Sequence, residues 1–551
     1  MKIVIVGGVA GGATAAARLR RLSEDSEIIV LERGPDVSFA NCGLPYYIGG
    51  VIEDREELLL HTPESLSQRY RLDVRVKSEA LSIDTAGKNI RIRDIAGNRE
   101  YTETFDKLLL SPGAFPVRPP IPGADNPLVR TLRNVSDTDA LTELALKGGN
   151  AVVVGGGFIG IEMAESLCRR GIAVDLVEAR PQILWNLDPE MAWPAQKRME
   201  KNGVRVRLNE TVSAITPQDN RLTVTTKSGL TLPASFVLLA IGVKPETSLA
   251  REAGIQIGVT GGIQVDEKMR TSSPDIYAVG DAVEVSHRVT GKPVLPYLAG
   301  PANRQARIAA DSMMGRAEKY SGAITTAIVG IFGLQVASSG VTEKTLKAES
   351  IPYLKAYLHP LNHAGYYPGG SRLHMKILFT PKDGRILGIQ AVGDEGADKR
   401  VDVIALAIRS GMTVNDLAEA ELAYAPQFGS ARDPVNQAGL VAGNILSGDM
   451  VPAYPDELAG LQAKGAIILD VRTKSEFRLG RIPNSLHIPI DDLRTRLGEV
   501  PKKGPVIVCC QVGLRGYVAA RILIQAGYDA RNLMGGFLTY ESFGLEIAKG
   551  G

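Results

Sequence analysis

Cysteine is scarce in this chain, because its 551 residues include only Cys42, Cys168, Cys509 and Cys510. No two of them form a C-x-x-C pair, and their spacing is unlike the disulfide framework of a small secreted domain. The sequence therefore predicts a reduced, cytoplasmic protein without structural disulfides.

Long apolar runs and a surplus of one charge are also missing. No segment reaches 18 uninterrupted apolar residues, which argues against a membrane span. The opening MKIVIVGGVAGGATAAARLRR imitates a signal peptide, but glycines interrupt its apolar run and basic residues follow it. Lys and Arg number 63 against 61 Asp and Glu, so the formal charge is +2. We therefore expect no nucleic-acid or membrane partner, and any anion recognition should be local.

The N-terminal segment has the pattern of a βαβ unit, the first of several domains that this length predicts. An apolar strand is expected at 2–8, a helix at 13–22 and a second strand at 27–33. Glycines fill the turn after the first strand, where they permit close approach of a pyrophosphate. Val9 replaces the middle glycine of G-x-G-x-x-G, which weakens the motif, but Glu32 is placed to accept from a ribose hydroxyl.

A second βαβ unit is expected from strand 151–154, a G-x-G-x-x-G turn at 155–160, helix 158–170 and strand 172–178. Glu178 ends this strand, and a carboxylate there favours the free 2′-hydroxyl of NADH, although Arg180 keeps NADPH as an alternative. Cys168 shares a helix face with Ile161 and Ala164, which predicts a small buried side chain.

A third segment, 271-TSSPDIYAVGDAVEV-285, resembles the one that brings an aspartate, here Asp281, to the flavin ribityl chain of flavoproteins with two dinucleotide units. With the strands expected at 108–116 and 238–245, it makes residues 1–445 similar to the pyridine nucleotide–disulfide oxidoreductases. The resemblance implies FAD on the first unit, NAD(P)H on the second and a homodimer. The implied FAD contacts are Gly7, Gly8, Ala10, Gly12, Glu32, Arg33, Asn41, Ala80, Ser111, Gly113, Asp281 and Ala299. The implied NAD contacts are Gly155, Gly157, Ile159, Gly160, Glu178 and Gly242.

Cys42, in 38-SFANCGLPYY-47, has no partner of the kind that dithiol members of this family carry. The fifth residue after it is Tyr47, and the stretch 423–436 lacks the histidine that dithiol members use for proton transfer. A lone thiol works through a mixed disulfide, a persulfide or a sulfenate. The segment resembles the single-cysteine branch, especially coenzyme A-disulfide reductases, and a buried packing cysteine is the ordinary alternative. Ala10 stands where peroxidases and oxidases of the family have histidine, which disfavours peroxide or oxygen as the principal acceptor.

Coenzyme A would need cations near this thiol, and Arg18 and Arg21 share a helix face on which they could meet its phosphates. A solvated face is the ordinary interpretation of such charges. The resemblance implies a CoA nucleotide near Thr14, Arg18 and Arg21, its pantetheine near Ser38 and Asn41, and a looser match at Arg71.

Tyr366 and Tyr424 resemble the two tyrosines that coenzyme A-disulfide reductases supply from the partner subunit, where a phenol can donate to a departing thiolate. Tyr367 is the rival for the first position. A buried or interface aromatic residue is the alternative for each.

The last part of the chain resembles a rhodanese domain in the order of its segments, which are 466–472, 476–489, 505–509, 516–527 and 533–537. Its reactive loop would be 510-CQVGLR-515, where backbone N–H groups and Arg515 stabilise a thiolate or persulfide. Strand alternation predicts that Cys509 packs beneath the loop and Cys510 opens it. A tyrosine-phosphatase loop is the competitor, but it usually has five residues before its arginine. Arg481 and Gly516 depart from common rhodanese sequences, which puts thiosulfate activity in doubt.

The predicted fold is α/β, with two Rossmann-like dinucleotide-binding domains, an α+β dimerisation domain and a C-terminal α/β rhodanese domain. The expected ranges are 1–110 plus 246–322 for FAD, 111–245 for NAD(P)H, 323–447 for dimerisation, 448–457 for a linker and 458–551 for the rhodanese domain.

The hypothesis is that NADH, through FAD, reduces the species on Cys42, while Cys510 handles sulfane sulfur and CoA serves as substrate or bound shuttle. CoA disulfide, CoA persulfide and polysulfide stay unranked, because each presents the same S–S bond. The alternatives are an NADH oxidase or peroxidase, and a rhodanese-type sulfur carrier or redox sensor. No metal is expected.

Overall fold

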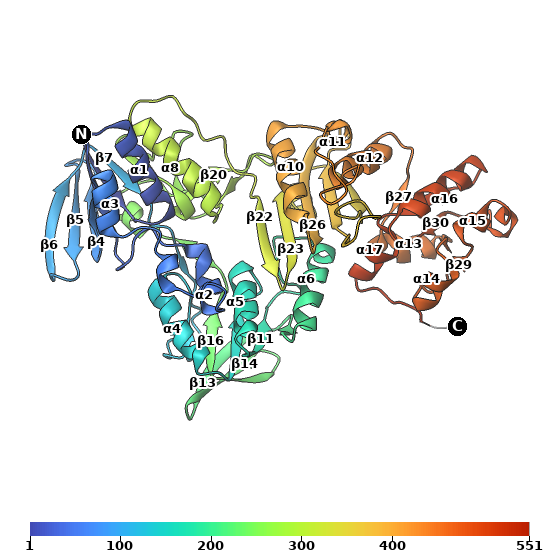
Figure 1. Cartoon of the computed structure of the whole chain (residues 1–551), viewed down its shortest axis with the longest axis horizontal. Coiled ribbons are helices and arrows are strands. Elements are labelled where there is room, and N and C mark those ends of the chain that lie inside the picture. The colour runs from blue at the N-terminus through green and yellow to red at the C-terminus, as the bar shows by residue number, and fades with distance from the viewer. Residues whose placement is uncertain (550–551) are drawn as a thin grey trace. The chain divides into compact units, whose positions relative to one another are not determined.

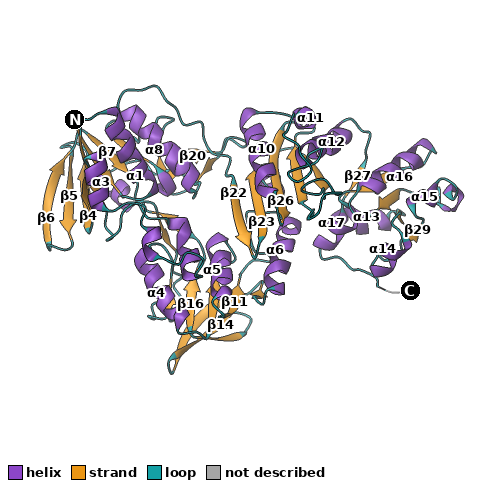
Figure 2. Ribbon diagram, in the orientation of Figure 1, coloured by secondary structure: helices purple, strands orange, loops and turns teal. Residues whose placement is uncertain are grey.

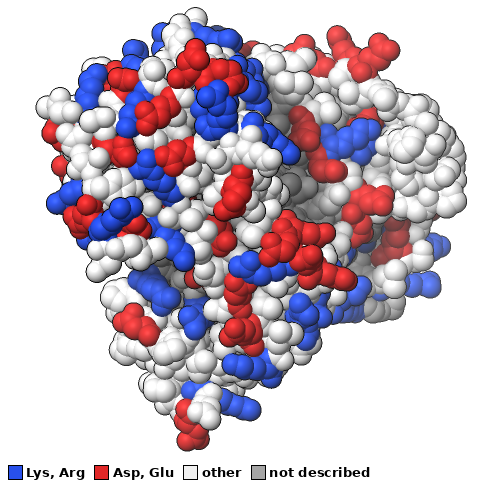
Figure 3. Space-filling view, turned by 60° about the vertical axis from the view of Figure 1, so that its left-hand side comes forward, with Lys and Arg blue, Asp and Glu red and all other residues white. Residues whose placement is uncertain are grey.

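The computed structural model describes residues 1–549. The chain forms two compact units, one of Met1–Ile183 with Gly203–Thr325 and one of Leu184–Asn202 with Thr326–Gly551. Within the described residues, no helix is both long and apolar enough to cross a membrane. Positive and negative side chains are interspersed on the face drawn in Figure 3, as the small net charge leads one to expect.

The first unit begins with a parallel sheet built on the N-terminal βαβ pattern. Its strands are β1 Lys2–Val6, β2 Glu27–Leu31, β3 Asp73–Arg75, β7 Lys107–Leu110 and β19 Ile276–Ala278, in the order β19-β7-β1-β2-β3. The apolar run of β1 is fully buried at Ile3, Val4 and Ile5, because helices cover a parallel sheet on its faces. Helix α1 (Ala10–Leu22) packs beside α8 (Ala299–Met313), both drawn next to this sheet in Figure 2.

The second parallel sheet of this unit has the order β12-β11-β10-β16-β9. Its strands are β9 Val129–Arg130, β10 Asn150–Val154, β11 Ala173–Val177, β12 Arg205–Arg207 and β16 Phe236–Leu239. Strands β8 (Ala114–Pro116) and β17 (Val243–Pro245) pair antiparallel, as the connector between the two dinucleotide domains. Smaller sheets are formed by β4 Ser78–Asp84, β5 Asn89–Asp94 and β6 Arg99–Thr104, by β13 Val212–Gln218, β14 Arg221–Thr226 and β15 Thr231–Ala234, and by β18 Ile263–Gln264, β20 Val283–Ser286 and β21 Pro293–Val294.

Short helices complete the first unit. They are α2 Leu44–Ile48, α3 Pro63–Tyr70, α4 Val135–Leu146, α5 Phe158–Arg169 and α7 Ser248–Glu252, with 3₁₀ turns η1 Asn41–Gly43, η2 Arg55–Leu58 and η3 Gly280–Ala282. On α5, Ile161 and Ala164 are fully buried, but Cys168 is only partly so. The prediction of a buried Cys168 was therefore too strong, and the residue lies in the last turn of the helix.

The second unit contains an antiparallel sheet in the order β22-β23-β26-β25-β24. Its strands are β22 Ala327–Ile331, β23 Leu334–Gly340, β24 Leu354–Leu358, β25 His374–Phe379 and β26 Ile386–Gly393, and its helices are α9 Glu343–Ala348, α10 Ala397–Ser410, α11 Val414–Glu419 and α12 Pro434–Leu446. Helix α6 (Pro189–Lys201) also packs on this sheet. The range 111–245 predicted for the NAD(P)H-binding domain thus includes a helix that folds with the second unit.

The C-terminal part of the second unit is a parallel sheet in the order β27-β31-β30-β28-β29. Its elements are β27 Pro452–Ala453, β28 Ile467–Asp470, β29 Leu486–His487, β30 Val506–Cys509, β31 Ala530–Leu533, α13 Leu458–Ala463, α14 Lys474–Leu479, α15 Ile490–Leu493, α16 Leu514–Gln525 and α17 Gly536–Ser542 (Figure 1). Strand β27 lies inside the range 448–457 predicted as a linker. The sheet therefore begins before residue 458, since Pro452 and Ala453 pair with β31.

Candidate active site

The two dinucleotide turns use their glycines in the same way. Gly7 and Gly155 have φ values of +95° and +112°, which glycine adopts without strain. A side chain on Gly12 would collide with the Gly7 carbonyl oxygen, and one on Gly160 with the Gly155 carbonyl oxygen. These glycines therefore let α1 and α5 start close against their strands, which directs backbone N–H groups to one point.

The acids that follow the second strand of each βαβ unit make the same kind of contact with their glycine turns. Glu32 accepts from the Gly8 N–H at 2.9 Å, and Glu178 accepts from the Gly156 N–H at 2.7 Å. Each carboxylate is thus held at its glycine turn and retains lone pairs for further donors such as ribose hydroxyls.

Open space borders three of the glycines predicted to face the cofactors. A Cβ built on Gly113, Gly157 or Gly242 has no described atom within 4 Å, whereas the other glycines of the two turns are closely packed. The residues present therefore fit two bound dinucleotides.

The Cys42 segment is tied to the first of these turns. The Ser38 N–H donates to the Gly8 carbonyl at 2.8 Å, and the Ala40 N–H donates to the Leu58 carbonyl at 2.7 Å. Ser38 has a φ of +51°, so the chain bends sharply before η1 carries Cys42. Cys42 and Asn41 are exposed, which leaves the thiol open to a substrate.

Acidic groups surround the Cys42 thiol. Protein atoms that desolvate it raise its pKa, and the negative charges of Glu162 and Asp281 raise it further. Burial also raises the pKa of Asp281 to about 6, while Arg133 opposes that shift. The protein charges alone therefore disfavour the thiolate of Cys42.

Tyr46 and Glu162 were not singled out from the sequence. The Tyr46 hydroxyl donates to Glu162 at 3.1 Å, and this contact joins α2 to α5. The two helices can approach closely because Gly49 has no side chain. A Cβ at this position would lie 2.9 Å from Ser166. An acid among apolar residues in 158-FIGIEMAESL-167 is the signal that could have revealed Glu162.

The residues implied for coenzyme A do not all lie together. On α1, the Thr14 hydroxyl donates to Asn303 at 2.7 Å, and Arg18 donates to the buried Asp311 at 2.6 and 2.9 Å. Both contacts reach α8, whereas Arg71 is exposed at the end of α3 and pairs with Glu24 at 3.6 Å.

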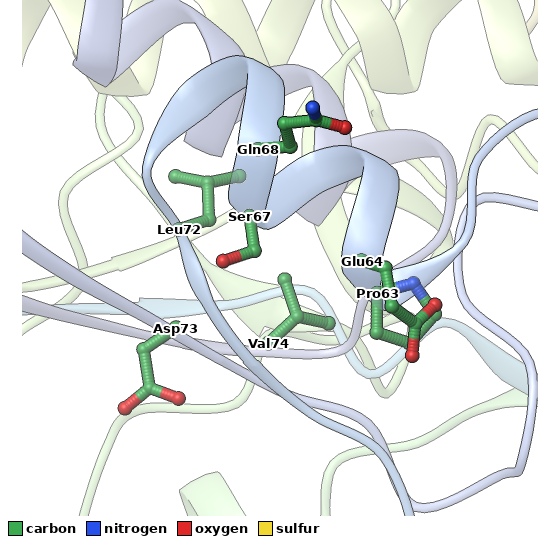
Figure 4. A pocket seen from close by; sticks show the side chains of 7 residues that line it. All are labelled: Pro63, Glu64, Ser67, Gln68, Leu72, Asp73 and Val74. Carbon is green, nitrogen blue, oxygen red and sulfur yellow. The ribbon is translucent and has the colours of Figure 1, made fainter.

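Arg18 remains a candidate for phosphate binding, because its guanidinium has five N–H donors and Asp311 engages only two of its nitrogens. Arg21 is exposed on the same helix. An open hollow beside α3, of about 520 Å³ (Figure 4), contains none of the predicted residues. Its charged lining residues are Glu64 and Asp73, which do not suit an anionic ligand.

The structure brings two of the three candidate tyrosines together. The hydroxyls of Tyr366 and Tyr424 lie 2.8 Å apart, and both side chains are exposed. The hydrogen bond from Tyr366 raises the pKa of Tyr424, so its phenol stays protonated at neutral pH. Tyr367 instead packs edge-on against His363, with ring centroids 5.7 Å apart. The pair Tyr366–Tyr424 is thus the better placed for proton donation.

The loop 510–515 wraps around the Cys510 sulfur. The Gly513 N–H donates to the Cys510 Sγ at 3.1 Å, at the start of α16. Cys509 and Cys510 belong to different apolar clusters of this sheet, as strand alternation predicts. Both are fully buried, and Cys510 begins the loop directly after β30 ends at Cys509.

Arg515, at the end of the reactive loop, forms an ion pair with Glu476. Its guanidinium donates to both oxygens of Glu476 at 2.9 and 2.6 Å, and this arginine holds the pKa of Glu476 at about 2. Behind the loop, the buried Arg472 pairs with Asp470 and donates to Gln511 at 3.2 Å. Glu476 and Arg472 were not predicted as site residues, because they lie far from the loop along the chain.

Gly516, which departs from common rhodanese sequences, lies in close contact with Asn532. An added Cβ there would collide with the Asn532 Oδ1 on β31, so a larger residue would require this side chain to shift.

Three family models match the chain. Residues 1–306 match the pyridine nucleotide-disulphide oxidoreductase model, and residues 326–434 match the dimerisation domain of the same family. The chain belongs to the pyridine nucleotide-disulphide oxidoreductase family. Residues 454–542 match the rhodanese-like domain, so this oxidoreductase carries a rhodanese-like module at its C-terminal end. The resemblance to this family and to a rhodanese domain, and the predicted fold class, are confirmed.

Two solved structures match almost the whole chain, and a shorter curated relative matches 80% of it. A coenzyme A disulfide reductase of Staphylococcus aureus (strain JH9) is 36% identical over 444 residues, 80% of this chain and 99% of its own length. The structure of reduced Bacillus anthracis CoADR-RHD matches with a TM-score of 0.96 and 46% identity, over 98% of each chain. A NAD-dependent persulfide reductase from A. fulgidus matches with a TM-score of 0.93 and 36% identity, over 98% of this chain and all of its own.

A buried charge cluster in the second unit of this oxidoreductase lies outside the predicted site. Asp188, Glu190 and Glu343 have carboxylate oxygens close enough to hold a metal ion. The Lys376 ammonium occupies the centre, however, at 2.8, 2.6 and 2.7 Å from the three carboxylates. The cluster thus contains its own cation.

Proposed function

We propose that this oxidoreductase uses NADH and FAD to reduce sulfur–sulfur bonds of CoA disulfide, CoA persulfide or polysulfide at Cys42, while its rhodanese-like domain transfers sulfane sulfur at Cys510. The observation that carries the proposal is the lone Cys42 thiol, exposed on a segment that is hydrogen-bonded to the first glycine turn. The names of the relatives, coenzyme A disulfide reductase and persulfide reductase, support the same substrates.

The cofactor assignments rest on the two turns. FAD would be held by the first, with Gly7, Gly8, Ala10, Gly12, Glu32, Arg33, Asn41, Ala80, Ser111, Gly113, Asp281 and Ala299, and NADH by the second, with Gly155, Gly157, Ile159, Gly160, Glu178 and Gly242. When bound, FAD supplies the electrons of NADH to the sulfur carried by Cys42. We assign NADH over NADPH because the Glu178 carboxylate would repel a 2′-phosphate.

Cys42 breaks the substrate bond by thiol–disulfide exchange. Its thiolate attacks one sulfur of R–S–S–R′, a Cys42–S–S–R bond forms and R′–S⁻ leaves. With CoA disulfide the overall reaction gives two CoA thiols for one NADH and one proton, and with CoA persulfide it gives CoA thiol and hydrogen sulfide.

The departing thiolate needs a proton, which the hydrogen-bonded phenols Tyr366 and Tyr424 can donate. Thr14, Arg18, Arg21, Ser38, Asn41 and, more loosely, Arg71 would bind CoA. In the C-terminal module, the Gly513 N–H at the Cys510 sulfur supports a role for Cys510 as the persulfide carrier. The paired tyrosines would act across a homodimer of this cytoplasmic enzyme, formed through its dimerisation domain.

Anaerobic NADH oxidation by the purified protein tests the proposal. CoA disulfide and CoA persulfide are compared in wild type, Cys42→Ser and Cys510→Ser. Turnover with both substrates that Cys42→Ser abolishes, and a selective loss of persulfide use in Cys510→Ser, would support the fused mechanism. NADH oxidation that needs oxygen and no sulfur acceptor would instead indicate an oxidase, and sulfur delivery that survives Cys42→Ser would indicate a carrier.

A further inference from the structure

The dimerisation domain contacts the rhodanese-like domain through one edge of its sheet. Strand β24 presents Lys355 and Tyr357 on the same face, and His359 continues this alternation just after the strand. The Tyr454 hydroxyl donates to the Lys355 carbonyl at 2.8 Å, and Tyr357 packs edge-on against Phe543. Just beyond the C-terminal end of β24, His359 Nε2 and the Thr539 hydroxyl of α17 form a hydrogen bond of 2.7 Å.

This hydrogen bond is fully enclosed. His359 is 6% exposed and Thr539 is 1% exposed. Burial lowers the pKa of His359 well below its ordinary value, helped by His374 and Arg372, so the imidazole is neutral. Its Nδ1 has no hydrogen-bond partner among the described residues, so Thr539 is the only side chain that satisfies this ring. Loss of the contact with Thr539 would leave both ring nitrogens of this buried imidazole without a side-chain partner, which is costly.

A double-glycine turn links Thr539 to the reactive loop. Gly535 and Gly536 have φ values of +68° and +64°. A side chain on Gly535 would collide with the Thr539 hydroxyl and lie 3.0 Å from His359 Nε2. The turn therefore rests directly on the histidine–threonine pair.

The other side of the same turn touches the loop. A side chain on Gly536 would collide with the Cys510 carbonyl and lie 2.9 Å from the Gly513 nitrogen. The Phe537 N–H donates to the Cys510 carbonyl at 2.7 Å, and the Leu538 N–H donates to the Gln511 carbonyl at 3.2 Å. The Gly513 N–H is in turn the donor to the Cys510 sulfur.

We propose that His359 is a positioning residue for sulfur transfer at Cys510: through Thr539 it holds the Gly535–Gly536 turn, which holds the reactive loop around the sulfur. The dimerisation domain is thereby part of the support of the rhodanese site. The inference rests on the proposed role of Cys510 in sulfur transfer, but its structural part, support of the loop, can be measured without any turnover.

The test compares four substitutions in the full-length protein. Thr539→Val and His359→Leu remove the hydrogen bond, and His359→Gln keeps a side-chain amide nitrogen near the position of Nε2. Tyr454→Phe is the matched control, because it removes another hydrogen bond between the same two domains without touching α17. Differential unfolding of the C-terminal domain is followed in each variant, so that a general loss of stability is detected.

The first measurement is iodoacetamide labelling of Cys510, read at its peptide by mass spectrometry. Cys510 is fully buried, so loosening the loop is expected to speed labelling about fivefold, the effect of one neutral hydrogen bond. The second measurement is sulfane sulfur transfer from polysulfide to cyanide, in which Cys510 takes the sulfur as a persulfide and cyanide leaves as thiocyanate. Here kcat should fall by about the same factor while KM is retained.

The proposal predicts faster labelling and slower transfer in Thr539→Val and His359→Leu, recovery in His359→Gln and wild-type behaviour in Tyr454→Phe. Labelling of Thr539→Val at the wild-type rate would overturn it, and so would an equal effect of Tyr454→Phe. If labelling changes as predicted but no variant, including wild type, transfers sulfur, the loop support stands and the proposed role of Cys510 fails.

Discussion

Replacing Lys376 by methionine is expected to destabilise the dimerisation sheet strongly. Lys376 is fully buried on β25 and is the only cation among the described residues that pairs with Asp188 or Glu190. Glu343 would keep Lys347 and Lys355 as partners. The substitution therefore leaves two buried carboxylates without a counter-charge, which typically costs about 3–5 kcal/mol.

Hydrogen exchange measured by mass spectrometry on the peptide that contains β25 reports this cost directly. A loss of about 3–5 kcal/mol in opening free energy accelerates exchange by about a hundredfold to several thousandfold. Lys355→Met is the matched control, because Lys355 is also buried on this face but pairs with a carboxylate that retains Lys376. Exchange in Lys376→Met as slow as in Lys355→Met would refute the argument.

The pH dependence of the stability of this sheet should become weaker in Lys376→Met. Burial alone would raise the pKa of Glu343, but Lys376 and Lys347 hold it well below the ordinary range. In wild type this carboxylate adds stability above its unfolded pKa, and that stability is lost as the pH falls. In Lys376→Met this pH-dependent component should shrink, because Glu343 then keeps only Lys347 and Lys355 as partners.

Three further predictions concern the candidate site. Tyr366→Phe and Tyr424→Phe should each lower kcat with CoA disulfide by about tenfold in steady-state assays. This loss is smaller than the loss expected on removing a single general acid, because one of the two phenols remains. Tyr367→Phe should keep a kcat near that of wild type. Glu178→Ala should raise KM for NADH by about tenfold, because the acceptor for the ribose hydroxyl is lost. It should also lower the ratio of kcat/KM for NADH to kcat/KM for NADPH, because the charge that repels a 2′-phosphate is lost. The stability that Glu476 gives the rhodanese-like domain should be lost as the pH falls from its ordinary pKa to about 2, and a Glu476→Gln variant should lack this component in acid titrations followed by circular dichroism.

Much of the fold follows from local patterns in the sequence. The two glycine turns, their strand-ending acids and the apolar strands predicted both dinucleotide sheets, because each signal lies within one βαβ unit. The pairing of Tyr366 with Tyr424 was expected from the resemblance to a family, and no local pattern predicts it. The strand β27 was missed because two residues give no periodicity, and its pairing with β31 is decided by the whole sheet.

The charges around the site could not be predicted, because their partners are distant in sequence. Arg18 binds Asp311 on another helix, and Arg515 binds Glu476 from α14. In sequence each of these side chains looks like an ordinary surface charge, and only the packing of two elements brings it to its partner. The full burial of Cys510 could not be predicted, because strand alternation gives a direction but not the packing of Gly535 and Gly536 against the loop.

The most direct test of the single-thiol mechanism is to trap the substrate on the protein. The oxidised holoenzyme is incubated anaerobically with CoA disulfide. The masses of its cysteine-containing peptides are then measured by mass spectrometry before and after addition of one equivalent of NADH. We expect one CoA in disulfide linkage on the Cys42 peptide, its disappearance on addition of NADH, and no adduct in Cys42→Ser. CoA bound only at another cysteine, or an adduct on Cys42 that NADH does not remove, would contradict it.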